Sequence, residues 1–253
     1  MLCYILVVWH KMFRVYEYLN SLNEGAPFIS RLVIWEGVAD MVDLYTIGYS
    51  PFDVHQMIGV LFDYGINLVI DVRSSPYSAY YPNYNKEPLE RFLKKKSIHY
   101  RNYAQEFGAQ QTEKKFFAAT GYLDFELFTK SENFLQGFKK VQVIIDKKYT
   151  IALMCAEKDP AECHRSIMIT RVFSREGFSI KHILSDKSYE TQDSIEQRLL
   201  DKYFPVPSRN QTTLFEGFKS DAELIVEAYR RRNTEIGFKY EEEISGHLST
   251  ICH

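Results

Sequence analysis

The segment LMCAEKDPAECHRS places several reactive side chains within fourteen residues, from Leu153 to Ser166. Thiols and imidazoles serve proteins as nucleophiles, bases and metal ligands, and carboxylates take up and release protons. Because an apolar run directly precedes this segment, we expect a buried strand that ends in a group of titratable residues. The residues of interest are Cys155, Glu157, Cys163, His164 and Arg165.

A second polar pair, Asp71 and Arg73, ends another apolar run, INLVIDVR. Such runs are typical of parallel strands covered on both faces, whose binding crevice lies beyond their carboxyl ends. We therefore expect Asp71, Arg73, Cys155 and Glu157 to gather at one edge of a sheet. Held close together, the carboxylates of Asp71 and Glu157 would divide the roles of acid and base, whereas an arginine between them would keep both ionised.

The two thiols have three further interpretations. Cys155 or Cys163 can act as a nucleophile, with His164 or Glu157 handling protons. Cys155, Cys163 and His164 can instead bind a metal, but their spacing matches no standard zinc pattern and no fourth ligand is evident, so we assign no metal ligand. Both cysteines can also be small buried hydrophobes, as free cysteines often are.

The stretch DPAEC has the order of a helix start, with Asp159 as the cap, Pro160 in the first position and Glu162 completing a capping box. This predicts that Cys163 and His164 lie in the second helical turn. There, exposed amides and the helix dipole favour an anion and lower the pKa of a thiol.

Arginines at both strand ends add positive charge to the predicted site. Together with the helix start, Arg73 and Arg165 predict a ligand that bears phosphate, either a small molecule or a nucleic acid. The whole chain carries 31 basic and 33 acidic side chains, so no global field attracts nucleic acid or a membrane. Any contact with nucleic acid must therefore come from a local patch.

Four cysteines, two of them near the ends of the sequence, are too few for a disulfide framework and favour a reducing compartment. The apolar run at residues 2–9 is too short to span a bilayer and follows no basic residue. We therefore expect a cytoplasmic protein without membrane contact. Met41 precedes the first convincing strand, so residues 1–40 are expected to be a poorly integrated extension or a start-site artefact.

Strand and helix patterns alternate from residue 44, which predicts an α/β fold with a mostly parallel sheet flanked by helices, a Rossmann-like three-layer arrangement. The domain boundaries that we predict are an N-terminal extension at 1–43, the α/β core at 44–186, and a helical C-terminal part of the same domain at 187–253. Within the core, a helix is expected after Ser50 and Pro51, ending at Gly65. A second, long helical stretch is expected over 116–147, interrupted near Ser131.

The blocks TIGYSPFDV, LVIDVRSSPYS, LMCAEKDPAECHRSIMI and IKHIL resemble those of the domain of unknown function 488 family, in the same order and spacing. The Cys-Ala-Glu and Cys-His-Arg pair is specific to that family, and the resemblance covers about residues 44–236. It implies the α/β fold and a shared polar site, without an established reaction. The shared positions correspond here to Asp71, Arg73, Pro76, Ser78, Cys155, Glu157, Cys163, His164 and Arg165.

Taken together, these observations predict an enzyme that acts on a phosphate-bearing ligand. Ser78, Arg73 and Arg165 are the expected ligand-binding residues, and the cofactor and the oligomeric state stay open. A non-catalytic ligand- or metal-binding module is the first alternative. Cysteine chemistry of the rhodanese or phosphatase kind is the second, although the interval from Cys155 to Arg165 lacks the glycines of an oxyanion-wrapping loop.

Overall fold

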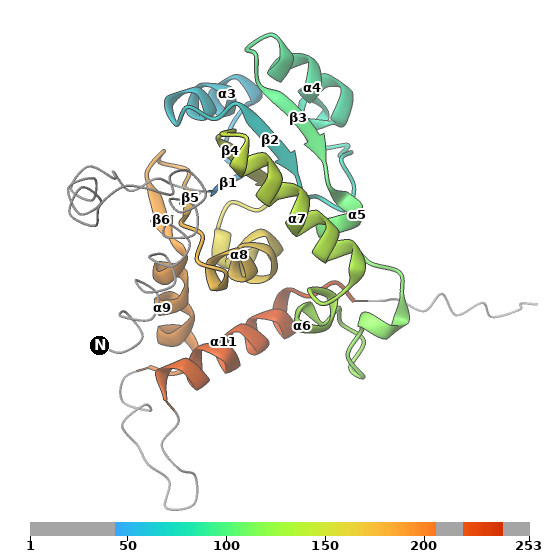
Figure 1. Cartoon of the computed structure of the whole chain (residues 1–253), viewed down its shortest axis with the longest axis vertical. Helices are drawn as coiled ribbons and strands as arrows, with labels where there is room; N and C mark the ends of the chain where they lie inside the picture. The colour runs from blue at the N-terminus through green and yellow to red at the C-terminus, as the bar shows by residue number, and fades with distance from the viewer. Residues whose placement is uncertain (1–43, 206–219, 240–253) are drawn as a thin grey trace, which may run out of the picture.

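The computed structural model describes residues 44–205 and 220–239 (Figure 1). Its centre is a six-stranded sheet in the order β3-β2-β4-β1-β5-β6. All neighbouring strands are parallel except β5 and β6, which confirms the mostly parallel α/β fold. The strands are β1 (Leu44–Gly48), β2 (Leu68–Asp71), β3 (His99–Asn102), β4 (Ile151–Cys155), β5 (Ile180–Ile183) and β6 (Tyr189–Thr191).

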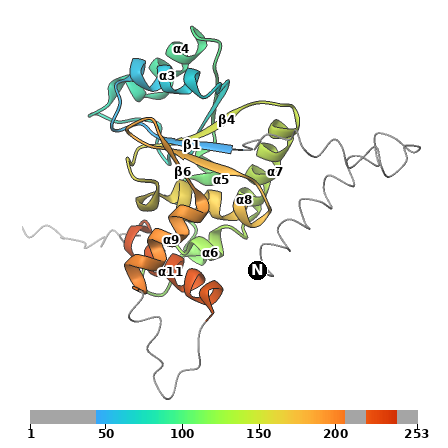
Figure 2. The same ribbon diagram turned by 90° about the vertical axis from the view of Figure 1, so that its left-hand side faces the viewer.

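Helices cover both faces of the sheet, as the edge-on view in Figure 2 shows. One face carries α3 (Val54–Asp63) and α4 (Lys86–Lys94); the other carries α5 (Ala104–Phe107), α7 (Glu132–Asp146) and α8 (Arg171–Arg175). Successive side chains of a strand point to opposite faces, so Leu153 and Met154 of β4 belong to two separate apolar cores. The continuous apolar runs of the sequence follow from this double coverage.

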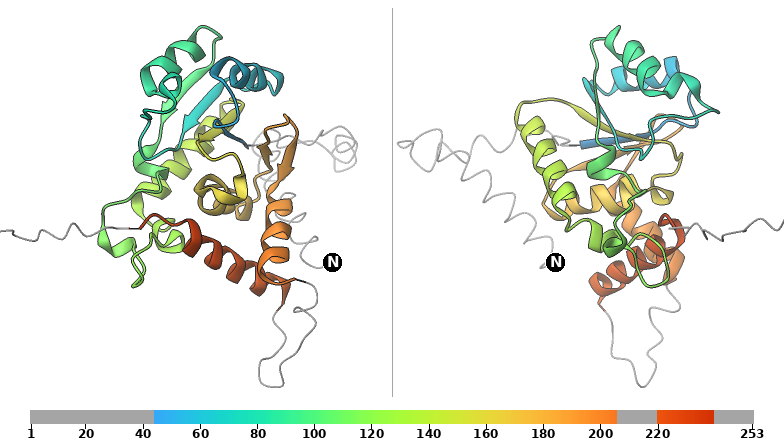
Figure 3. Two further views of the ribbon diagram at one scale, coloured as in Figure 1. Left: turned by 180° about the vertical axis from the view of Figure 1, so that it is seen from behind. Right: turned by 90° about the vertical axis from the view of Figure 1, so that its right-hand side faces the viewer.

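The described residues of the C-terminal part are mainly helical, as predicted, after the short strand β6. This part comprises α9 (Gln192–Tyr203) and α11 (Asp221–Ile236), which pack against each other, and α11 also approaches the short helix α6 (Phe125–Phe128) (Figures 1 and 3). Asn233 of α11 ties the two together, because its side chain accepts a hydrogen bond from Phe125 N and donates one to Leu123 O, both at 2.9 Å. Both views in Figure 3 show α9 and α11 at the end of the molecule opposite to α3 and α4.

Two predicted elements differ from the structure. The cap of α3 is Asp53, whose carboxylate accepts from His55 N and Gln56 N, rather than Ser50 followed by Pro51. The predicted end of α3 at Gly65 is confirmed, since this glycine has a φ of 65° directly after the last turn.

The long helical stretch predicted over 116–147 was wrong in its first third. Residues 117 and 123 form an isolated antiparallel bridge around a turn in which Gly121 has a φ of 81°, a conformation that interrupts a right-handed helix. Asp124 then caps α6, and Ser131 caps α7 by accepting a hydrogen bond from Phe134 N. The apolar residues of this stretch belong to a turn and two helices. Their helical spacing alone does not distinguish this arrangement from one long helix.

The predicted N-terminal extension at 1–43 lies outside the described residues, as do 206–219 and 240–253. Within the described ranges, no helix is long and apolar enough to cross a membrane.

Candidate metal centre

The candidate site lies where β4 leaves the sheet between its neighbours β1 and β2. Gly48 of β1 is the register partner of Cys155, and Asp71 of β2 is the partner of Met154. The strand ends that carry the two predicted polar groups are therefore adjacent, as expected. Backbone pairing continues past the strand, because Tyr49 N donates to Cys155 O at 3.0 Å.

A buried arginine holds the loop that follows β4. Arg165 is fully buried, and its Nη1 donates to Glu157 O at 2.7 Å while its Nε donates to Thr46 Oγ1 at 3.3 Å. The loop carbonyl passes so close to β1 that a Cβ at Gly48 would lie 1.9 Å from Glu157 O. Arg165 was predicted to bind a ligand; the structure places it as a support that bends the chain back toward β4.

The predicted helix start at DPAEC is only partly present. Asp159 does cap a turn, with its side chain accepting from Ala161 N, but the turn is a short 3-10 segment, η4 (Pro160–Glu162). Cys163 follows in an extended conformation, with φ of −130° and ψ of 140°, and the next helical segment, a π-helix, begins at Arg165. The prediction that Cys163 occupies a second helical turn was therefore wrong, because the helical hydrogen bonding is interrupted there.

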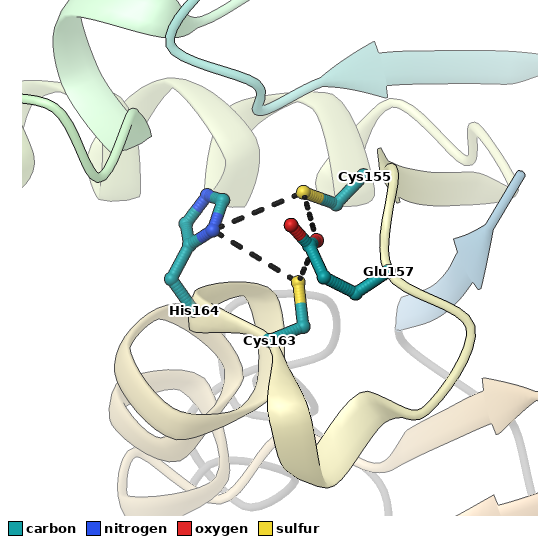
Figure 4. Close-up of side chains that lie close together, drawn as sticks. All are labelled: Cys155, Glu157, Cys163 and His164. Atoms are coloured by element: carbon teal, nitrogen blue, oxygen red, sulfur yellow. Dashed lines mark hydrogen bonds between the residues drawn. The ribbon is translucent and has the colours of Figure 1, made fainter. Parts of the chain in front are cut away.

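This interruption turns Cys163 and His164 toward the end of β4 (Figure 4). Both sulfurs lie near the same carboxylate oxygen, since Glu157 Oε2 is 2.8 Å from Cys155 Sγ and 2.9 Å from Cys163 Sγ. His164 Nδ1 is 3.8 Å from Cys155 Sγ and 3.9 Å from Cys163 Sγ. The four donor atoms all lie within 4.8 Å of one another.

Glu157 supplies the fourth donor that sequence reasoning did not find. Its residue lies on an exposed loop, yet its carboxylate points inward at the two thiols (Figure 4). Tetrahedral zinc with two sulfur ligands and one nitrogen ligand separates these donors by about 3.5 to 3.8 Å. The two distances from His164 Nδ1 to sulfur, 3.8 and 3.9 Å, exceed the nitrogen–sulfur spacing by about 0.3 Å. Glu157 Oε2 lies closer to both sulfurs than two ligands of one zinc ion would.

The second nitrogen of His164 fixes its protonation pattern. Nε2 lies 3.0 Å from Val72 O, and because a carbonyl only accepts, Nε2 must carry a proton. In the neutral ring this leaves a free lone pair on Nδ1, which faces the thiols. A backbone carbonyl that orients the ring in this way is the usual outer partner of a metal-binding histidine.

The two thiols differ in charge. Burial raises the pKa of Cys155 well above its ordinary value. Burial acts in the same direction on Cys163, but the hydrogen bond with Cys155 and the charges of Arg165 and His164 outweigh it and hold the pKa of Cys163 well below the ordinary value. One of the two buried thiols is therefore readily ionised, which metal binding requires.

The pKa values of His164 and Glu157 are shifted by the neighbouring thiols. Burial opposes the imidazolium form of His164, yet the charge of Cys163 outweighs it and raises the pKa of the ring. Burial, together with the charge of Cys163, raises the pKa of Glu157.

Asp71 and Arg73 form a separate buried pair beside this cluster. Arg73 donates from Nε to Asp71 Oδ1 at 2.9 Å and from Nη2 to Asp71 Oδ2 at 2.6 Å, and Tyr100 OH donates to Asp71 Oδ2 at 2.7 Å. The hydrogen bonds to Asp71 raise the pKa of Arg73 against the opposing effect of burial. Arg73 thus pairs with Asp71 alone and does not lie between the carboxylates of Asp71 and Glu157, so neither of the two arrangements considered for these acids is present as predicted.

A cavity of about 330 Å³ opens beside the cluster. Cys155, Glu157, His164 and Arg73 line it, whereas Cys163 does not. Both thiols are buried, with Cys155 2% and Cys163 1% exposed. Ser78 does not line it; its hydroxyl accepts from Tyr80 N and Tyr81 N within the loop that precedes α4.

Several lining residues of this cavity were missed by sequence reasoning. Tyr49 follows the end of β1 and could have been found by the same strand-end argument that selected Asp71. The same argument applies to Ser74 and Ser75, which follow Arg73 beyond the end of β2. Gln110 and the residues at the end of α11 have no such signal, because they reach the cavity from distant segments. These additional lining residues are Tyr49, Ser74, Ser75, Gln110, Ile236 and Phe238.

Comparison with known protein families gives one match. Residues 53–172 match the family model described as Domain of unknown function DUF488, and no curated protein or solved structure matches the chain. The matched range is narrower than the resemblance inferred from the sequence blocks, but it includes the buried pair and all four donor residues. The chain therefore carries a domain of the DUF488 family, with the cysteine, glutamate and histidine cluster inside it.

Proposed function

We propose that this protein is a metal-dependent enzyme in which Cys155, Cys163 and His164 hold a zinc ion and Glu157 handles the proton of a bound water. The observation that carries the proposal is the convergence of four donor atoms, with the Nδ1 lone pair of His164 directed at both sulfurs. Two thiolates and an imidazole suit zinc, which accepts sulfur and nitrogen ligands in tetrahedral geometry.

The position of the cavity favours a reactive centre over a purely structural one. Structural zinc sites are closed by four protein ligands, whereas catalytic sites use three and leave one position to water or substrate. Here the cavity reaches Cys155, Glu157 and His164. Glu157 comes from the exposed loop, so it is the donor that can leave the metal to a water and act on that water instead.

The chemistry that follows is metal-assisted hydrolysis. A zinc ion held by Cys155, Cys163 and His164 would supply a coordinated water of lowered pKa. The carboxylate of Glu157 would accept the proton of that water as its oxygen bonds to an electrophilic carbon or phosphorus, and would return the proton to the leaving group as its bond breaks. Zinc held by cysteine and histidine with an adjacent glutamate is the combination by which nucleobase deaminases attack a ring carbon. Tyr49, Ser74 and Gln110 give the cavity wall polar groups for a small substrate.

Binding of a phosphate-bearing ligand stays a prediction, but the two arginines expected to bind the phosphate have other partners. Arg73 lines the cavity, but Asp71 balances its charge, and Arg165 is engaged with loop carbonyls. With both arginines occupied in this way, we assign the larger part in binding an anionic group to the metal itself.

A thiol nucleophile has weaker support. Cys163, the thiol that ionises readily, is 1% exposed and does not line the cavity. Cys155 does line the cavity, but burial raises its pKa. Because a nucleophile needs both access and ionisation, neither thiol combines the two properties.

The first test is metal content. Protein purified without chelator and supplied with zinc should contain about one zinc ion per chain by mass spectrometry of the metal, because the site offers one group of donors. Cys163→Ser should abolish this zinc. Wild-type protein that stays metal-free and folded would overturn the proposal.

The role of Glu157 is tested by Glu157→Gln. If Glu157 is the base, this variant retains zinc and loses hydrolysis across a panel of phosphate esters, carboxylic esters and amino-substituted nitrogen heterocycles, read as acid or ammonia release. Glu162→Gln is the matched control, because Glu162 also lines the cavity but its carboxylate pairs with Arg232 at 3.1 Å. Loss of zinc from Glu157→Gln would instead make Glu157 the fourth ligand of a closed structural site.

A further inference from the structure

The surface between α3 and α4 forms a groove that continues along α4 alone. Both helices lie on the face of the sheet opposite to α7 and α8 (Figure 2). The groove consists of two adjoining hollows of about 490 and 600 Å³, which share Phe92 and Lys95 as their common wall. The groove lies near the ends of α3 and α4 that point away from the carboxyl edge of the sheet. It is therefore separate from the candidate metal centre.

Aromatic rings form one side of this groove. Phe62 at the end of α3 is 76% exposed, which is unusual for a large apolar side chain. Phe92 of α4 is half-buried and meets the ring of His55 edge-on, with centroids 5.3 Å apart. Between them, Gly59 leaves the surface of α3 open, because a Cβ there would have no neighbour within 4 Å.

Positive charge forms the other side. Arg91, Lys94, Lys95 and Lys96 are all exposed, and none of them joins an ion pair with another described residue. Cations near the last turn of a helix do stabilise the helix dipole, which accounts for Arg91 and Lys94. It does not account for the exposed phenylalanine beside them, nor for this local excess in a chain with a net charge of −2.

We propose that the groove between α3 and α4 binds single-stranded nucleic acid. Bases stack on exposed aromatic rings irrespective of their sequence, and lysines follow the phosphates. Each hollow combines aromatic and cationic side chains: one has Phe92 with Arg91, Lys94 and Lys95, and the other has Phe62 and Phe92 with Lys95 and Lys96. Among the described residues, Asp63 is the one acidic side chain in their lining, so the rim has a clear excess of positive charge. The charge of the rim is complementary to a phosphate backbone, and the concave shape fits an unpaired strand better than a stiff duplex.

The proposal is independent of the metal centre. Variants in the groove should leave zinc content unchanged, and variants of Cys163 should leave binding of nucleic acid unchanged. If only one of the two proposals fails, these paired measurements identify which one.

The experiment is fluorescence anisotropy with a labelled single-stranded oligonucleotide, titrated with the full chain over a series of salt concentrations. Phe62→Ala should weaken binding about tenfold through the lost stacking surface. The triple variant Lys94→Glu, Lys95→Glu, Lys96→Glu should also weaken it and flatten the dependence of log K on log salt by about 2, the value expected for three lost phosphate contacts. All four positions are exposed, so the variants should fold normally.

The matched control is the double variant Lys139→Glu, Lys147→Glu, which reverses two exposed lysines of α7 and its end on the opposite face of the sheet. It should retain wild-type affinity. The proposal is overturned if wild-type protein does not bind at low salt, if the control weakens binding as much as the groove variants, or if the groove variants change binding only to vesicles of anionic lipid.

Discussion

Replacing Gly48 with alanine should disrupt the metal centre without changing any of its donor residues. Gly48 ends β1 beside the loop that carries Glu157, and an added Cβ would lie 1.9 Å from Glu157 O and 2.9 Å from its carbonyl carbon. Real Cβ atoms essentially never approach another heavy atom closer than 3.0 Å, so the carbonyl must retreat by more than about 1 Å. Because the obstructing atoms belong to the backbone, no side-chain rotation can relieve the contact.

The size of the effect follows from what the carbonyl does. It accepts the 2.7 Å hydrogen bond of Arg165 Nη1, and Arg165 is fully buried. Loss of one hydrogen bond to a charged group costs about 1.5 to 3 kcal/mol, and an uncompensated buried charge raises that cost. We expect Gly48→Ala to lower the free energy of unfolding by about 3 kcal/mol, which corresponds to a fall in Tm of roughly 6 to 12 °C for a domain of this size.

The assay combines urea unfolding with zinc content. Gly48→Ala should bind substoichiometric zinc, because the displaced loop joins Cys155 to Cys163 and its movement changes the spacing of these two ligands. Gly59→Ala is the matched control: its Cβ would meet no atom within 4 Å in the middle of α3, so it should keep its zinc and gain about 0.5 to 1 kcal/mol of stability. Wild-type stability and zinc content in Gly48→Ala would refute the close approach of loop and strand.

Three further predictions concern the surroundings of the site. Burial lowers the pKa of His182 to about 3, so below pH 6.5 this histidine is protonated in the unfolded chain but neutral in the folded chain. The free energy of unfolding should therefore fall by up to about 1.4 kcal/mol per pH unit toward pH 4. Urea titrations of His182→Gln should lack this contribution. Asp71→Asn breaks the buried pair with Arg73 and should lower the free energy of unfolding by about 3 to 5 kcal/mol, whereas an unchanged value would show that the pair is not structural. Asn233→Ala leaves Phe125 N and Leu123 O without their partner and should cost about 2 to 4 kcal/mol in the same assay. Asn233→Asp keeps the acceptor but sets a buried carboxylate oxygen against Leu123 O, so it should cost at least as much.

Local patterns were sufficient for most of the sheet and for the positions of the chemically active residues. Apolar runs bounded by turn residues indicated β1, β2, β4 and β5, because a strand covered on both faces must be apolar throughout. The same runs placed Asp71 and Cys155 at the carboxyl ends of strands, where parallel sheets bind ligands. The strand β6 was missed, since three exposed or half-buried residues at a sheet edge carry no distinctive pattern.

The sequence alone therefore determined the α/β class and the residue types available for chemistry, while their roles were decided by the tertiary structure. Sequence spacing suggested that Cys163 lies in a helix, which the structure contradicts, and it gave no sign that Arg165 holds the loop after β4. Arg165 is buried among the carbonyls of the Glu157 loop, and the extended backbone at Cys163 directs its thiol toward Cys155. The physical reason is that a hydrogen bond or a coordination group depends on distances between segments that come together only when β1, β2 and β4 pair, and residue order along the chain does not encode those distances.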